Sequence, residues 1–108
     1  MSNLIGTYVC KELSAQFKVT EANDSNGNGK GVFLLGTMSL EVSIHYHFKN
    51  SGGPETTLLF SGGKDDPNQY VGGAGFYPNN NKVTEITLAG GWSTINEAIG
   101  FSSKFIRS

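Results

Sequence analysis

A few short motifs in this chain carry side chains that could do chemistry, and the clearest is a histidine pair. His45 and His47 stand two positions apart, so a β-strand would put both imidazoles on one face, together with Glu41. Imidazole and carboxylate groups at that spacing could bind a metal ion. The same residues are also typical of the polar outer face of a strand, and we favour that interpretation. The sequence therefore predicts no metal site here.

Two turns that contain aspartates could also be interpreted as metal-binding or catalytic sites. The segment Asp24–Gly29 matches the start of a calcium-binding loop, but the twelfth position is Leu35, where a bidentate glutamate is needed. Its Asn-Gly step is instead a hairpin turn signal. Asp65 and Asp66 precede Pro67-Asn68, which indicates a solvated turn. Neither turn predicts catalysis.

The remaining nucleophile is Cys10, which has no activating base near it in the sequence. A free cysteine is usually buried and inert. The chain offers no Ser-His-Asp set that spacing alone would support. We therefore expect no enzymatic activity and no cofactor.

The elements that must position these residues are strands. From Met38 to Phe48 apolar and polar side chains alternate strictly, which predicts a half-buried strand longer than the usual length of about five to six residues. The expected strands are Ile5–Cys10, Gln16–Glu21, Gly31–Leu35, Met38–Phe48, Thr56–Ser61, Gln69–Phe76, Val83–Leu88 and Gly100–Arg107. Short connections between them favour antiparallel hairpins. Ser93–Ala98 is expected as a short helical turn or a loop.

These elements predict an all-β fold with one domain over residues 1–108. We expect an antiparallel up-and-down β-barrel of about eight strands, with a β-sandwich as the alternative. The net charge of −1 provides no basic field for nucleic acid, and no apolar run reaches the roughly 20 residues of a membrane span. The N-terminus lacks a signal-peptide pattern, which favours a cytoplasmic protein or a mature secreted form with an added methionine.

Several patches resemble avidin and streptavidin. They include Gly6-Thr7-Tyr8, Thr57-Leu58-Leu59-Phe60-Ser61-Gly62 and Gln69-Tyr70-Val71-Gly72-Gly73-Ala74, and His47-Phe48-Lys49-Asn50 is similar to the family's Trp-Lys-Asn segment. The resemblance implies an eight-stranded barrel whose mouth holds biotin and which forms a dimer or tetramer. The region Gly31–Asn50 is shorter than in the family.

Carried over by this resemblance, the polar biotin ligands are mostly replaced. The asparagine falls at Cys10 or Lys11, the serine at Ser14 or Ala15, and the tyrosine at Phe33. The tryptophan positions fall at Phe48 and Phe60, and the aspartate at Ser102 or Ser103. The candidate interior site comprises Tyr8, Cys10, Ser14, Phe33, Tyr46, Phe48, Phe60 and Ser103. Each lost hydrogen bond in a dry pocket costs about 1–3 kcal/mol, so tight biotin binding is not expected.

Two classes of function follow. The first is a non-enzymatic, avidin-like barrel that binds a small apolar or amphipathic ligand inside. The alternative is a carbohydrate-binding or protein-interaction module whose site lies on surface loops, with Asp65, Asp66, Asn68, Tyr77, Asn79 and Trp92 as candidates. A barrel filled by its own side chains would favour the loop site. We also expect a homodimer or homotetramer, because the small residues of Val71–Gly75 allow close approach of another subunit.

Overall fold

A computed structural model of the protein describes residues 2–47, 55–78 and 82–108. Phe48 and Asn79 therefore lie outside the described residues. The strands are β1 (Gly6–Cys10), β2 (Ala15–Asn23), β3 (Asn28–Leu35), β4 (Met38–Tyr46), β5 (Glu55–Gly62), β6 (Gln69–Pro78), β7 (Glu85–Thr94) and β8 (Ala98–Arg107). Each strand pairs antiparallel with its sequence neighbour, and β8 returns to β1 to close the barrel. The predicted all-β, up-and-down barrel is confirmed, and the sandwich alternative is wrong.

Strand β4 shows why the alternation in the sequence is decisive. Leu40, Val42, Ile44 and Tyr46 are buried, and the polar residues between them are exposed. Since successive side chains of a strand point to opposite faces, this pattern commits one face to the core. The strand extends through Tyr46 and leads into the residues that the structure does not describe.

Of the two alternatives for Ser93–Ala98, the loop is correct and the helical turn is wrong. Ser93 pairs with Ala98, so the segment is the tight end of the β7–β8 hairpin. The Thr94 hydroxyl accepts the backbone N–H groups of Asn96 and Glu97, each at 3.3 Å, and the Thr94 N–H donates to the Glu97 carbonyl at 2.9 Å. The residues that suggested a helix cap therefore close a hairpin, because both flanking strands extend to this point.

Five phenylalanines fill the centre of the barrel. The Phe33 ring stacks on Phe60 and on Phe101 with centroids 5.9 and 5.4 Å apart, and Phe17 meets Phe60 edge to face at 5.3 Å. The Phe105 ring lies 6.2 Å from that of Phe33. These are ordinary distances for packed aromatic pairs, so the rings use one another as neighbours.

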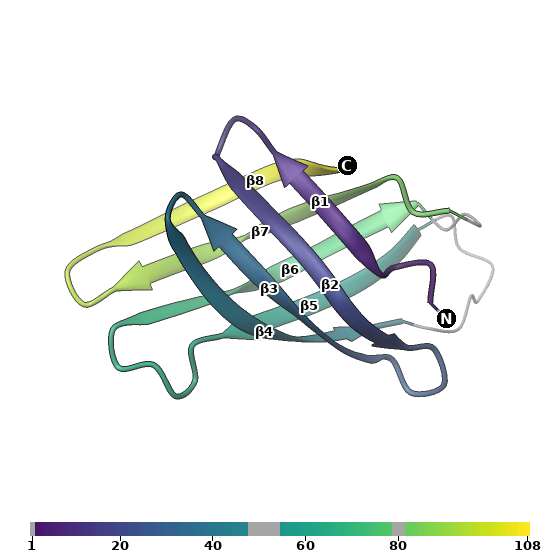
Figure 1. The fold of residues 1–108 in the computed structure, drawn as a ribbon, viewed down its shortest axis with the longest axis horizontal. Coiled ribbons are helices and arrows are strands. Elements are labelled where there is room, and N and C mark those ends of the chain that lie inside the picture. Colours follow the sequence, from purple (N-terminus) through teal and green to yellow (C-terminus); the bar gives the residue numbers. More distant parts are fainter. Residues whose placement is uncertain (1, 48–54, 79–81) are drawn as a thin grey trace.

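The barrel closes unevenly. Figure 1 shows β1–β4 crossing over β5–β8, so the two groups of strands meet along two seams. At the β4–β5 seam, pairing covers Val42–Tyr46 and leaves Met38–Glu41 without a β5 partner. At the β1–β8 seam, pairing is limited to Tyr8 with Arg107 and Val9 with Ile106. Both seams therefore open toward the same end, where the β5–β6 and β7–β8 hairpins project.

Candidate functional site

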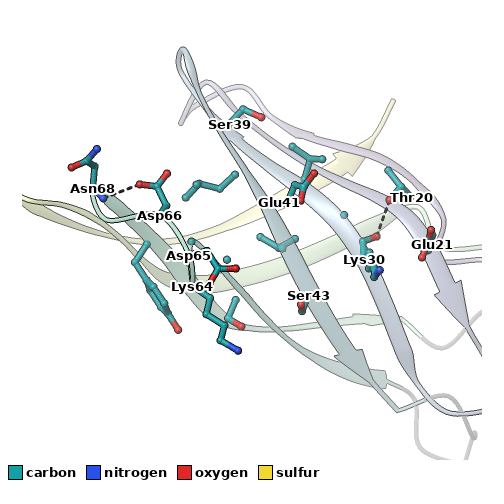
Figure 2. Close-up of a pocket in the computed structure, with 18 of the residues that line it drawn as sticks. Thr20, Glu21, Lys30, Ser39, Glu41, Ser43, Lys64, Asp65, Asp66 and Asn68 are labelled. Atoms are coloured by element: carbon teal, nitrogen blue, oxygen red, sulfur yellow. Dashed lines mark hydrogen bonds between the residues drawn. The ribbon is translucent and has the colours of Figure 1, made fainter.

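A cavity of about 1020 Å³ lies on the outer wall of the barrel at the β4–β5 seam, and we call it the seam cleft. One wall carries outward-facing side chains of neighbouring strands, because the register aligns Val32 with Glu41 and Lys30 with Ser43, and the buried Leu40 and Val42 also line the cavity. The segment Gly63–Asn68 lines the other side. Figure 2 shows this segment on one side of the cleft and residues of β2 and β3 on the other. The cleft therefore joins a rigid sheet to a single loop.

A β-bulge adds polar side chains to this wall. The β2–β3 register shifts between Val19 and Glu21, which leaves Thr20 without a paired partner. The Thr20 hydroxyl donates to the Lys30 carbonyl at 3.1 Å and so satisfies a backbone group beside the bulge. Bulges redirect side chains, and here consecutive residues Thr20 and Glu21 both line the cleft.

The loop Gly63–Asn68 owes its shape to a glycine and an aspartate. Gly63 has φ of +88°, and a Cβ built there would lie 2.9 Å from the Tyr70 Cα, so other residues would be strained at this position. The Gly63 carbonyl accepts the Asp66 N–H at 3.0 Å. The Asp66 carboxylate in turn accepts the Asn68 N–H at 2.8 Å (Figure 2). These bonds hold the loop beside the cleft.

The lining is polar and carries both signs of charge. Its carboxylates are Glu21, Glu41, Asp65 and Asp66, and its cations are Lys30 and Lys64. Across residues 2–47, 55–78 and 82–108 the only ion pair joins Lys104 Nζ to Glu85 Oε2 at 3.6 Å, outside the cleft. None of these charged side chains forms an ion pair with another described residue, and the Asp66 carboxylate bonds to the Asn68 N–H of its own loop.

An aromatic ring stands at one border of the cleft. Tyr70 lines the cavity and is 52% exposed, which is unusual for so large an apolar surface. Serine hydroxyls of β4 and β5, from Ser39, Ser43 and Ser61, line the same cavity. Donors, acceptors and one ring face thus share one concave surface.

The residues predicted for an interior site separate into distinct groups. Cys10 donates to the Ser103 hydroxyl at 3.2 Å, and Phe33 and Phe60 belong to the packed aromatic centre. Ser14 lies in the β1–β2 turn with φ of 52°, where its carbonyl accepts the Gly36 N–H at 3.0 Å. Phe48 is not described. The structure therefore brings Cys10 together with Ser103 and leaves Ser14 in a turn.

The two tyrosines of that prediction take part in other hydrogen bonds. The Tyr8 hydroxyl donates to the Leu4 carbonyl at 2.7 Å and accepts from Arg107 Nη2 at 2.8 Å. Burial raises the pKa of Tyr8 to about 12, although the Arg107 charge opposes this shift. The Tyr46 hydroxyl donates to the Asp24 carboxylate, and burial together with this bond raises the pKa of Tyr46 to about 12. Both hydroxyls are thus occupied by the protein itself.

The residues predicted for a loop site are only partly placed on loops. Asp65, Asp66 and Asn68 line the seam cleft together. Tyr77 and Trp92 instead lie on strands β6 and β7 and are buried, so their predicted place on surface loops is wrong. The reason is that both strands extend further than the sequence indicated and that each ring falls on the inward face. Asn79 is outside the described residues.

Sequence reasoning missed Tyr70, Thr20 and Lys30 as lining residues. Lys30 could have been found from its alternation with the buried Gly31 of β3. Tyr70 alternates with the buried Val71 in the same way. Lys30 and Tyr70 lie beside the loop Gly63–Asn68 because of how β4 and β5 pair at their seam. No local sequence pattern predicts that arrangement.

Two further cavities lie on the outside of the barrel. One of about 700 Å³ is lined by His45 and His47 together with Leu59, Ala74 and Phe76 of the outer sheet face. The other, of about 790 Å³, follows the β1–β8 seam. In the part of the chain that the structure describes, no three or more His, Cys, Asp or Glu residues are grouped to hold a metal ion.

Comparison of the chain with protein-family models, with curated proteins and with solved structures finds no significant match. None of the described segments is a helix of the length and hydropathy needed to cross a membrane. The candidate site must therefore be judged from its own geometry.

Proposed function

We propose that this chain is a non-enzymatic binding protein that takes a small polyhydroxylated ligand, a carbohydrate, in the seam cleft. The proposal rests on one observation. The exposed Tyr70 ring lines the same concave surface as several carboxylates, an amide and hydroxyl groups. Sugars present C–H faces that stack on aromatic rings and hydroxyls that bond to carboxylates and amides. Such a ligand would use both kinds of surface at once.

The packing of the barrel interior supports the outer cleft over an interior site. The stacked rings of Phe33, Phe60 and Phe101 occupy the centre, and a ligand there would have to displace them. Removing a packed aromatic ring from a core costs about 3–5 kcal/mol. Binding of an apolar or amphipathic ligand inside the barrel would therefore be opposed by this free-energy cost. Binding in the seam cleft requires no such displacement, because the cleft is already open.

A panel of immobilised neutral, amino and acidic sugars tests the proposal. We expect at least one sugar to bind the wild type, and Tyr70→Ala to weaken that binding about tenfold through loss of the stacking surface. Phe76→Ala is the matched control, because Phe76 is another exposed aromatic residue of β6, 43% accessible, outside the cleft. Absence of binding across the panel, or equal losses in both variants, would contradict the proposal.

The likeness to avidin concerns the barrel, we infer, and not the biotin site. In support, the Cys10 thiol already bonds to Ser103, and Phe33 offers a stacked ring where the family has a hydroxyl. Contact through the remaining aromatic rings would give at best a millimolar dissociation constant, about −4 kcal/mol. Calorimetry against biotin measures this directly, and a nanomolar constant would contradict the inference.

We also propose that the chain self-associates as a homodimer or homotetramer. Large apolar side chains stand exposed on the outer strands, among them Leu59 at 59% and Ile99 at 40%. Exposed apolar surface of this kind favours contact with another protein surface. Light scattering over micromolar concentrations should give a mass of at least two chains, and the mass of one chain throughout would refute self-association.

A further inference from the structure

Strand β8 has a long free edge. Residues Ala98–Phe105 pair with β7 along one side, but on the other side the backbone of β8 pairs with β1 only at Ile106 and Arg107. Among the described residues no other strand pairs with this stretch. The free edge lies at the end of the barrel where the β7–β8 hairpin projects (Figure 1).

The hydrogen bonds at the end of β8 identify which backbone groups are unused. The Arg107 N–H donates to the Thr84 carbonyl at 2.8 Å, on the β7 side, and the Ser108 N–H donates to the Thr7 carbonyl at 3.0 Å, on the β1 side. Because N–H and C=O groups alternate in direction along an antiparallel strand, the odd-numbered residues of β8 bond to β7. Ala98, Gly100, Ser102 and Lys104 therefore direct both groups to the free edge.

This edge lacks the features that usually prevent edge pairing. Natural edge strands carry charges, prolines or bulges, or are covered by another segment. The segment Ala98–Ser103 has no charged residue and no proline, and its register with β7 is continuous. The free part of β4, by contrast, contains Glu41 and lies beside the loop Gly63–Asn68 across the seam cleft.

We propose that a second copy of this chain pairs with this edge, β8 to β8 and antiparallel, which continues the β5–β8 sheet across a two-fold axis. This inference rests on the proposed self-association and names the surface that carries it. A register centred on Phe101 uses the free groups of Ala98, Gly100, Ser102 and Lys104 on both chains, because Gly100 then faces Ser102 of the partner subunit. Closed two-fold pairing of one surface with itself is the commonest form of homo-oligomer.

The charges that flank the edge favour the antiparallel arrangement. Glu97 precedes the free stretch and Lys104, which also forms an ion pair with Glu85 of β7, lies at its other end, so the two ends carry opposite charges. In the register centred on Phe101, Lys104 lies opposite Ala98 of the partner subunit, directly beside Glu97 of the partner subunit. A parallel arrangement would place like charges together, which is unfavourable.

The β1–β2 turn leaves room for the partner strand. The cavity of about 790 Å³ at the β1–β8 seam lies between Lys11 and Glu12 on one side and Ser103 and Lys104 on the other. Lys11 and Glu12 of the turn therefore face Ser103 and Lys104 across this cavity, while the Cys10 thiol of β1 bonds to the Ser103 hydroxyl. Ile99, 40% exposed, would become covered by Ser103 of the partner subunit in the same register.

Light scattering of Ser102→Pro tests the proposal, with Ser102→Ala as the matched control. Proline removes an N–H that the barrel itself does not use, and edge strands accept proline at such positions. We expect a dimer for the wild type and Ser102→Ala, and at least a tenfold weaker dimer for Ser102→Pro with unchanged circular dichroism. A single-chain mass for the wild type refutes self-association altogether. An unchanged dimer in Ser102→Pro refutes only the β8 edge.

Amide hydrogen exchange gives a readout that does not depend on the proline variant folding. The N–H groups of Gly100, Ser102 and Lys104 should exchange slowly at high protein concentration and quickly at low concentration. Those of Phe101 and Ser103 should be protected at both, because they bond to β7. If Ser102→Pro fails to fold, Ser102→Lys keeps the donor and places like charges near the two-fold axis. A lack of concentration dependence at the even-numbered residues overturns the proposal.

Discussion

The two seams of the barrel are closed in different ways. At the β4–β5 seam the strands pair over Val42–Tyr46, and a shaped loop lies beside the part that stays open. At the β1–β8 seam only Tyr8 and Val9 pair with β8, and the Arg107 side chain adds hydrogen bonds beside this short pairing. Arg107 donates to the carbonyls of Asn3 and Ile5 and to the Tyr8 hydroxyl, and its Nε donates to the Val83 carbonyl.

This difference shows that a short stretch of backbone pairing can be supplemented by a single multivalent side chain. A guanidinium group has several donors in fixed directions, so it can join segments that are not hydrogen-bonded as strands. The β4–β5 seam combines pairing with an open polar cleft, which suits ligand binding. The β1–β8 seam leaves an open backbone edge, which suits strand addition.

The largest expected effect lies in the paired half of the β4–β5 seam. Ile44 is fully buried and pairs with Phe60, so Ile44→Ala should lower the free energy of unfolding by about 2–5 kcal/mol. His45 faces outward and bonds to Asn28, so His45→Ala should cost less than about 1 kcal/mol. Urea denaturation measures both, and equal losses would show that the burial of Ile44 does not decide stability at this seam.

Arg107→Ala tests the other seam. The substitution removes the donors of four hydrogen bonds and leaves part-buried acceptors unpaired, so we expect a loss of about 2 kcal/mol. Arg107→Lys retains the charge but not the planar arrangement of donors, and should recover only part of this loss. Full recovery by lysine in the same denaturation experiment would mean that charge, not multivalent bonding, closes the β1–β8 seam.

Gly63→Ala tests whether the loop Gly63–Asn68 contributes to ligand binding in the seam cleft. The positive φ and the nearby Tyr70 backbone make alanine strained there, with an expected cost of about 1–2 kcal/mol. Because the strain falls on the loop, sugar binding should weaken at temperatures where the barrel remains folded. Gly36→Ala is the matched control, since Gly36 also has a positive φ but its Cβ would meet nothing within 4 Å. Equal loss of binding in both variants would contradict a role for the loop.

The smallest effect is expected at alkaline pH, through the buried hydroxyls of Tyr8 at the β1–β8 seam and of Tyr46 at the β4–β5 seam. The ordinary pKa of tyrosine is about 10, and the values for Tyr8 and Tyr46 in the folded protein are raised to about 12. Between these values the folded state holds protons that the unfolded state has lost. The stabilisation is therefore complete below pH 10 and declines as the pH rises toward 12.

Unfolding free energies measured from pH 9 to 12 check this expectation. Tyr8→Phe should flatten part of the decline, because it removes one of the two buried hydroxyls whose pKa is raised. A stability that stays constant over this range would show that neither buried hydroxyl is coupled to folding.

The sequence by itself determined the class of fold and the identity of the buried face. Strict alternation over Met38–Tyr46 can satisfy only a half-buried strand, and the Asn-Gly turn after Asp24 can join only closely spaced strands. Both signals act within a few residues, so they are present in the linear order of the chain. The same locality explains why the seven consecutive hairpins could be anticipated.

Only the tertiary structure decided how many residues pair at each seam, and with that the position of the seam cleft and of the free β8 edge. The β1–β8 contact joins residues about a hundred positions apart, and no local periodicity states how many pairs it contains. Trp92 became buried because β7 continues beyond its local signal into the projecting hairpin, and Tyr77 because β6 continues to Pro78 at the opposite end of the barrel. Thr20, Tyr70 and Asp65 became neighbours of one cleft because strand pairing stops at Val42, a consequence of how the closed barrel distributes its hydrogen bonds.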